Sequence, residues 1–242
     1  MNAHIITIGD EILIGQTLNT NAAFIGALLS QNQINVSKTS VVGDDEQDII
    51  NEFNVCWAKN DLVICTGGLG PTIDDVTRKC IVQFFESELI LDQEVLADIK
   101  ERFERLKRVV TKLNEDQAMI PQCAVPIKNR KGTAPGYWIE QDKKLFIALP
   151  GVPSEMKEMM LSFVIPELKN KIGDLKKIRK TLSLLTTGIP ESTLFQKLGN
   201  LGEILQGARI AFLPNQFGTK LRISDEAETE RVVDLKLSEI EL

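Results

Sequence analysis

The feature that most constrains this chain is an apolar segment that runs directly into a cluster of glycines. Leu62–Thr66 is rich in β-branched residues, which predicts a buried strand. Three glycines stand within the next four positions, Gly67–Gly70, and a helical pattern opens at Asp75. A strand, a glycine loop and a helix start together present backbone N–H groups to an anion. The segment therefore predicts an α/β fold whose loop is either a plain turn or a phosphate cradle.

The residues after the glycines carry signals for a helix start. Thr72 stands three residues before Asp75, so Thr72 is expected to cap the helix and Asp75 to complete a capping box. A capped terminus still leaves other N–H groups free, so the cap is compatible with an anion site. Asp74 and Asp75 are paired carboxylates beside the glycines, which favours a functional site over a bare turn.

The order of the predicted elements indicates two domains. Strands are expected at 3–9, 34–42 and 62–66, each followed by a helix, and this alternation predicts parallel strands joined by right-handed crossovers. After a predicted linker at 170–175, the order β-α-β-β-α suits a small α+β domain. We therefore predict a first domain over residues 1–170 and a second over residues 175–242.

Composition restricts the class of protein. The 242 residues are 43% hydrophobic and 26% charged, as in an ordinary globular protein, and no apolar run approaches the ~20 residues of a membrane span. The N-terminal residues lack the basic segment of a signal peptide, and three of the four cysteines sit among apolar neighbours. A cytoplasmic protein without a membrane partner is therefore expected. The single histidine, His4, excludes a His-based zinc site.

The charge distribution makes no case for a nucleic-acid partner. The net charge is −6, and seven acids and two bases leave residues 225–242 at −5. Gly199–Gly202 matches the G-x-x-G pattern of KH domains, but its surroundings are not basic, so RNA binding is not expected. Residues 92–112 are basic, which indicates a solvated helix face or, alternatively, the border of an anionic ligand.

Two further acids follow the first predicted strand. Asp10 and Glu11 come directly after it, and the carboxyl edge of an open α/β sheet is where ligands bind. The alternative is that Asp10 stabilises a turn and Glu11 is solvated.

Five motifs stand in order along the chain and together closely resemble the CinA (competence/damage-inducible) family. They are Gly9-Asp10-Glu11, Asn19-Thr20-Asn21, the Thr66–Thr77 segment, Gly132–Gly136 and Leu149–Met156. The resemblance implies a three-layer α/β domain of the molybdopterin-binding kind, with a parallel or mixed sheet, over the first 170 residues. It implies a small KH-like α+β domain over about residues 175–242.

The resemblance also implies an activity. It implies that this chain forms a homodimer in a bacterial cytoplasm and has a divalent-metal-dependent pyrophosphatase activity on ADP-ribose and similar nucleotides. Many members carry a further C-terminal domain that deamidates nicotinamide mononucleotide. The sequence up to Leu242 contains no such domain, so no deamidase activity is attributed to this polypeptide.

The chemistry of the residues fits this activity. Carboxylates beside a phosphate cradle repel the substrate unless a metal ion lies between them. We expect Asp10, Glu11, Asp74 and Asp75 to be the catalytic acids, with Asp10 and Asp75 as ligands of Mg²⁺, Mn²⁺ or Co²⁺. The expected substrate-binding residues are Asn21, Asp44, Thr66, Gly67, Gly68, Gly70, Thr72, Gly136, Gly151 and Ser154. The glycine-loop amides would hold a phosphate, and Gly136 and Gly151 would form the opposite lip.

Two other functions stay open. The shared domain also supports molybdopterin binding or adenylylation, because molybdopterin is a phosphorylated pterin. The chain could instead be a non-catalytic nucleotide-binding module in an assembly, which would bind nucleotides without turnover.

Overall fold

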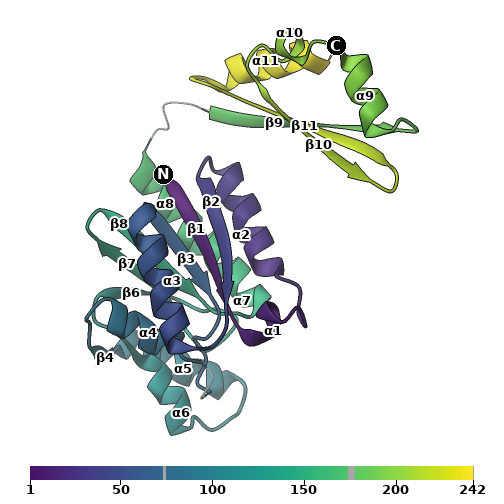
Figure 1. Cartoon of the computed structure of the whole chain (residues 1–242). Coiled ribbons are helices and arrows are strands. Elements are labelled where there is room, and N and C mark those ends of the chain that lie inside the picture. The colour runs from purple at the N-terminus through teal and green to yellow at the C-terminus, as the bar shows by residue number, and fades with distance from the viewer. Residues whose placement is uncertain (73–74, 174–177, 242) are drawn as a thin grey trace. The chain divides into compact units, whose positions relative to one another are not determined.

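The computed structural model describes residues 1–72, 75–173 and 178–241. Asp74, one of the expected catalytic acids, lies outside the described residues. The chain divides into two compact units, Met1–Lys171 and Ile172–Leu242 (Figure 1).

A six-stranded mixed sheet forms the centre of the first unit. Its spatial order is β2 (Asn35–Val42), β1 (Asn2–Ile8), β3 (Leu62–Thr66), β8 (Lys144–Leu149), β7 (Gly136–Gln141) and β6 (Ala124–Ile127). The first four strands in this order are parallel to one another. Strand β7 is antiparallel to both of its neighbours, β8 and β6, so β6 again runs in the direction of the first four. The βαβ alternation in the sequence predicted the parallel part, because helical crossovers return the chain to the same edge.

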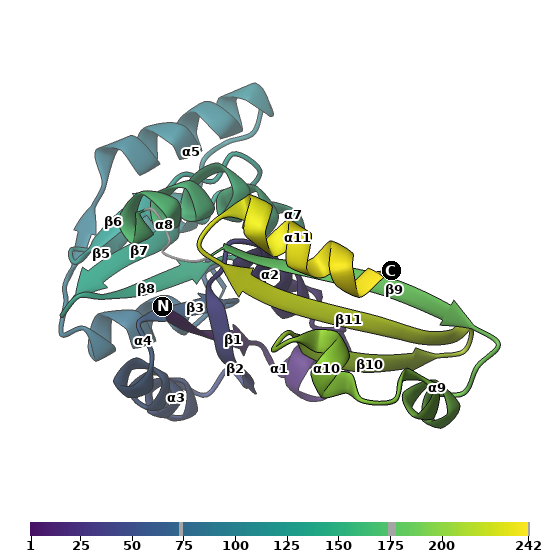
Figure 2. The same ribbon diagram turned by 90° about the horizontal axis from the view of Figure 1, so that it is seen from above.

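Helices cover both faces of the sheet, so the predicted α/β three-layer architecture is confirmed (Figures 1 and 2). The helices of this unit include α1 (Asp10–Leu13), α2 (Thr20–Gln31), α3 (Glu46–Lys59), α4 (Thr77–Phe84), α7 (Pro153–Met159) and α8 (Ile165–Ile172), with a π-helical turn at Met160–Val164. Helices α3 and α4 pack on one face, and α2, α7 and α8 lie on the other. Phe53 of α3 and Phe146 of β8, both fully buried, meet edge to face with ring centroids 4.9 Å apart.

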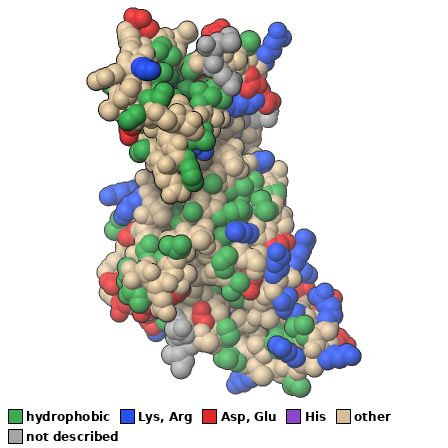
Figure 3. Space-filling view, turned by 90° about the vertical axis from the view of Figure 1, so that its right-hand side faces the viewer, with side chains coloured by type: hydrophobic (Ala, Val, Ile, Leu, Met, Phe, Trp, Pro, Cys, Tyr) green, Lys and Arg blue, Asp and Glu red, His purple; other side chains and the backbone are tan. Residues whose placement is uncertain are grey.

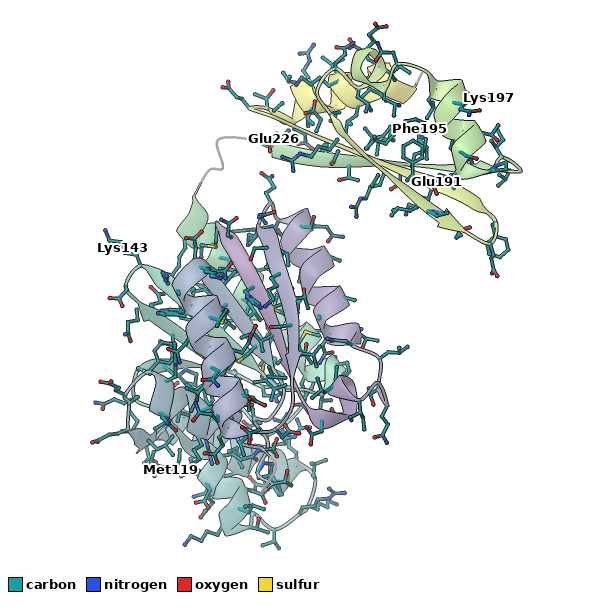
Figure 4. The ribbon with its side chains drawn as sticks, viewed as in Figure 1. Met119, Lys143, Glu191, Phe195, Lys197 and Glu226 are labelled. Atoms are coloured by element: carbon teal, nitrogen blue, oxygen red, sulfur yellow. The ribbon has the colours of Figure 1, made fainter. Side chains whose placement is uncertain are left out.

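Residues 89–121 form a separate part of the first unit, which we call the lobe. It contains β4 (Leu89–Leu91), α5 (Gln93–Arg105), α6 (Lys112–Glu115), a 3₁₀ turn (Asp116–Ala118) and β5 (Met119–Pro121). The lobe has its own small core of Val95, Ile99 and Ala118. Arg78 of α4 donates to the carbonyl oxygens of Asp116 at 2.6 Å and of Met119 at 3.2 Å (Figure 4 labels Met119). These bonds fasten the lobe to the sheet domain.

The second unit is a three-stranded antiparallel sheet with helices. Its elements are β9 (Ile178–Thr187), α9 (Glu191–Leu198), α10 (Leu201–Leu205), β10 (Arg209–Asn215), β11 (Gly218–Ala227) and α11 (Glu230–Glu241), and the sheet order is β10-β11-β9. The sequence predicted α9, which ends at Gly199 with φ +65°. It did not predict α10, because a helix of only five residues gives too short a pattern to recognise. Phe195, labelled in Figure 4, packs edge-on against Phe212.

Within the described parts of the chain, no helix is both long and apolar enough to cross a membrane.

Candidate functional site

Four loops meet at one edge of the large sheet. Strand β1 ends beside β2 with Ile8 opposite Val42, and Thr66 of β3 lies between Thr7 of β1 and Leu149 of β8. The loops after these parallel strands therefore leave from the same edge, where open α/β sheets bind ligands. These loops carry most of the residues that the sequence singled out.

The glycine loop after β3 requires glycine at two positions. Gly67 has φ +114°, and a Cβ there would overlap the carbonyl oxygen of Ile8. Gly68 has φ +63°, and a Cβ there would overlap Oγ1 of Thr77. Other residues rarely adopt these backbone angles, so the loop passes close to β1 and α4 only because both positions lack a side chain.

The N–H groups of the glycine loop divide into bonded and free ones. The Gly67 N–H donates to the Leu149 carbonyl at 3.0 Å, and the Gly70 N–H donates to Oδ1 of Asp75 at 2.8 Å. The N–H groups of Gly68 and Leu69 have no acceptor among the described residues. These two neighbouring N–H groups are therefore the ones free to bind an anion.

Asp75 shapes the loop rather than the helix. Besides the Gly70 N–H, its carboxylate accepts the Thr72 N–H at 2.9 Å and the Thr72 hydroxyl. Helix α4 begins only at Thr77, and its N-cap, Val76, makes no side-chain cap bond. The expected Thr72 cap and Asp75 capping box are therefore wrong, because the carboxylate is used to satisfy loop N–H groups before the helix starts.

Asp10 and Asp44 hold two of the loops together. The Asp10 N–H donates to Oδ2 of Asp44 at 3.1 Å, and the Asp44 N–H donates to Oδ1 of Asp10 at 3.2 Å. Asp44 and Glu11 line the cleft described below, whereas the exposed Asp10 is not among its lining residues. Asp10 thus positions Asp44 and joins the loop after β1 to the loop after β2.

Asn21 and Thr66 brace the loop after β8. The Asn21 amide nitrogen donates to the Gly151 carbonyl at 2.7 Å and to the Thr66 hydroxyl at 3.3 Å. The Thr66 hydroxyl in turn donates to the Pro150 carbonyl at 3.0 Å. Both side chains are buried, and Oδ1 of Asn21 has no partner among the described residues.

A cleft of about 610 Å³ opens in front of these loops. We call its lining residues from the four strand-end loops the sheet wall; they are Gly9, Glu11, Asp44, Gly67, Gly68, Leu69, Gly70, Pro71, Asp75, Pro150, Gly151, Val152, with Ile8 at the end of β1. We call the lining residues from the lobe and from 131–134 the lobe wall; they are Arg102, Phe103, Leu106, Arg108, Gln117, Lys131, Gly132, Thr133 and Ala134. The cleft therefore combines carboxylates and free N–H groups with three basic side chains.

The basic side chains of the lobe wall were not predicted as site residues. Arg102 donates to the carbonyl oxygens of Arg130 at 3.2 Å and of Lys131, which ties α5 to the segment 130–134. Arg108 and Lys131 are exposed and take part in no ion pair within the described residues. Figure 3 shows Lys and Arg side chains gathered over the end of the first unit that carries the lobe. The sequence interpretation of 92–112 left open a border with an anionic ligand, and two of its arginines do line the cleft.

The last two motifs contribute the expected Gly151 and also residues that were not predicted. Glu155 lines the cleft, where it accepts a 2.7 Å bond from the Asn129 amide and approaches Gly132. Ser154 is exposed and does not line the cleft, and Gly136 is buried in β7 opposite Ile127. Thr72 is likewise exposed outside the lining. The structure therefore does not bring Thr72, Gly136 or Ser154 together with the glycine loop in this cleft.

A second cleft of about 280 Å³ adjoins the first. Asn21 and Thr66 line it, and it shares Ile8, Glu11, Gly151 and Val152 with the large cleft. Glu11 and Gly151 therefore stand at a divide between two compartments.

The described residues do not contain a group of three or more His, Cys, Asp or Glu side chains arranged to hold a metal ion. Mg²⁺, however, is commonly held by one or two carboxylates together with substrate phosphates. Glu11 and Asp75 both line the cleft, and their carboxylates are the type of ligand that such a metal takes. Asp10, the other expected ligand, lies outside the lining.

Comparison with known proteins agrees with this architecture. Residues 4–170 match the family described as "Probable molybdopterin binding domain". The solved structure of CinA, of unknown function, from Thermoplasma acidophilum is 40% identical, with a TM-score of 0.63 over 67% of this chain and 95% of that one. The chain belongs to this domain family and to its CinA branch.

Longer relatives extend the similarity to the second unit. A CinA-like protein from Flavobacterium psychrophilum is 39% identical over 240 residues, which is 98% of this chain and 57% of the relative. Another from Salinibacter ruber is 39% identical over 229 residues, or 94% and 55% of the two chains. This CinA-family chain thus spans little more than half the length of these curated relatives.

Proposed function

We propose that this CinA-family chain hydrolyses the diphosphate bond of ADP-ribose or a related nucleoside diphosphate compound. One observation carries the proposal: the large cleft combines the free N–H groups of Gly68 and Leu69 with the carboxylates of Glu11 and Asp75 and with basic side chains. A diphosphate needs donors for its oxygens and positive charge to balance its own, and the reaction needs a group that takes a proton from water.

Each part of the cleft has a role in this reaction. The N–H groups of Gly68 and Leu69 bind one phosphate, and Arg108 and Lys131 balance the charge of the other. The oxygen of a water molecule bonds to one phosphorus while the bond from that phosphorus to the bridging oxygen breaks. The bridging oxygen leaves with the second phosphate, and the proton of the water passes to Glu11. Two monophosphates result.

A divalent metal is part of the proposal. Asp75, together with the phosphate oxygens of the substrate, would hold Mg²⁺, Mn²⁺ or Co²⁺, which would withdraw charge from those oxygens and leave Glu11 to take the proton. Asp10 then acts through Asp44, whose loop it holds, rather than as a direct ligand.

The two compartments suit a substrate with two halves. The diphosphate would lie at the divide near Glu11 and Gly151, with the nucleoside in the large cleft and the second sugar in the small one. Oδ1 of Asn21, which has no partner among the described residues, would accept a hydrogen bond from a hydroxyl group of that sugar.

A hydrolysis screen of nucleoside diphosphate compounds with Mg²⁺, Mn²⁺ and Co²⁺ tests the proposal. Asp75→Ala removes the acceptor of three loop hydrogen bonds and a metal ligand, so we expect a loss of kcat of about 100-fold or more. Asp142→Asn, in an exposed turn with φ +53°, is the matched control and should keep full activity. Unchanged rates and metal dependence in Asp75→Ala would refute the assignment.

The family description favours a second candidate, binding or adenylylation of molybdopterin. The same free N–H groups would then hold the single phosphate of the pterin. Calorimetric titration with ADP-ribose and with molybdopterin separates the two, since the pyrophosphatase proposal expects tighter binding of ADP-ribose. Binding of nucleotides without turnover under all three metals would instead support a non-catalytic assembly module.

A further inference from the structure

Gln117 is a buried polar residue that the proposed reaction does not use. It belongs to the 3₁₀ turn of the lobe, is 2% exposed and lines the large cleft. Its side-chain oxygen Oε1 and nitrogen Nε2 are both buried without a hydrogen-bond partner among the described residues. Buried amides are nearly always paired, so this carboxamide is expected to meet a partner when the cleft is filled.

The chemistry of the carboxamide limits what that partner can be. It offers one acceptor and one donor side by side in a plane. A phosphate supplies acceptors only, so it would leave Oε1 without a donor. The edge of adenine carries an amino donor next to a ring-nitrogen acceptor, and this is the pattern that glutamine pairs with in two bonds.

A second lining residue, Phe103, supplies a surface for the faces of such a ring. Phe103 comes from α5, is half-buried, and packs against the lobe core of Val95, Ile99 and Ala118. Because this core holds the aromatic ring in place, the ring can stack on a base without becoming ordered first.

We propose that Gln117 and Phe103 form the base subsite of the cleft and that Gln117 selects adenine. After a change of rotamer, Oε1 of Gln117 accepts a hydrogen bond from the 6-amino group, and Nε2 donates one to the adjacent ring nitrogen. This inference rests on the proposed function, because it assigns the base end of the same substrate. Because both residues belong to the lobe, the lobe would determine which nucleoside the cleft prefers.

The test compares ADP-ribose with its purine analogue, in which hydrogen replaces the 6-amino group. The wild-type chain should prefer ADP-ribose by about tenfold in kcat/KM, because the analogue leaves Oε1 unpaired. Gln117→Leu, which keeps the side-chain volume, should bring the ratio of the two substrates close to one. Because the readout is a ratio, a partial loss of folded protein does not change it.

Gln122→Leu is the matched control, since Gln122 lies five residues along the chain, is exposed and does not line the cleft. It should keep the wild-type preference. An unchanged preference in Gln117→Leu would overturn the inference while the pyrophosphatase function stood.

If the wild-type chain hydrolyses neither compound, the proposed function fails and binding decides the subsite. Calorimetry then compares AMP with purine riboside 5′-monophosphate. Tighter binding of AMP that Gln117→Leu abolishes would support the subsite, and equal affinities in the wild type would overturn it.

Discussion

The sheet wall and the lobe wall of the large cleft are built in different ways. The sheet wall consists of loops that leave strands whose register is set by backbone pairing, and Gly67 of this wall lies directly against the backbone of Ile8. The lobe wall consists of side chains from the lobe, among them Arg102, Arg108 and Gln117, and of the segment 131–134, which the hydrogen bonds of Arg102 tie to α5. The sheet wall therefore supplies backbone N–H groups, and the lobe wall supplies charged side chains and the proposed base subsite.

Alanine at one glycine of each wall tests this difference in stability. Gly67→Ala should lower the free energy of unfolding by about 3 kcal/mol, because a Cβ there meets the Ile8 carbonyl at an unfavourable φ. Gly132→Ala should cost about 1 kcal/mol or less, because its Cβ meets only the flexible end of Glu155. Urea denaturation measures both, and equal losses would contradict the comparison.

Removal of a lobe-wall charge should affect binding without affecting the fold. Arg108→Gln should lower kcat/KM by about tenfold, chiefly through KM and less so at high salt, because Arg108 lines the cleft without an ion-pair partner among the described residues and would face the proposed diphosphate. Arg105→Gln is the control, since Arg105 is exposed, pairs with Glu101 and does not line the cleft. Steady-state kinetics at two salt concentrations should show no difference between Arg105→Gln and the wild type. A similar loss in both variants would show that the charge acts only at long range.

The free energy of unfolding should depend on pH through His4, which lies in β1, the strand that ends at the sheet wall. Burial is the largest cause that holds the pKa of His4 below its ordinary value of 6.5, while Glu52 acts in the opposite direction. The unfolded chain therefore takes up a proton before the folded chain does, so the free energy of unfolding should fall as the pH drops below about 6.5. Urea denaturation between pH about 7 and about 5 should show a flatter dependence in His4→Gln. An identical slope in both proteins would exclude this role for His4.

The sequence predicted the sheet wall well and the lobe wall poorly, for physical reasons. Periodicity and βαβ order place Asp10, Glu11 and the glycine loop at one edge, because parallel strands all end there. Local pattern could not show that Asp75 bonds back to Gly70 rather than capping a helix, since both roles use the same residues at the same spacing. The position of the lobe depends on long-range bonds such as those of Arg78, so Arg108 and Gln117 could not be assigned to the cleft from sequence.

The divide formed by Glu11 and Gly151 has a consequence for product release. An intact substrate would be bound in both compartments at once. If one half of it came loose, the other half would stay bound and keep the molecule in place. If the diphosphate is cut as proposed, each monophosphate would occupy one compartment only and would lose that mutual retention. Cleavage itself would thus weaken the hold on both products, so that free mononucleotides would compete poorly with a new substrate molecule.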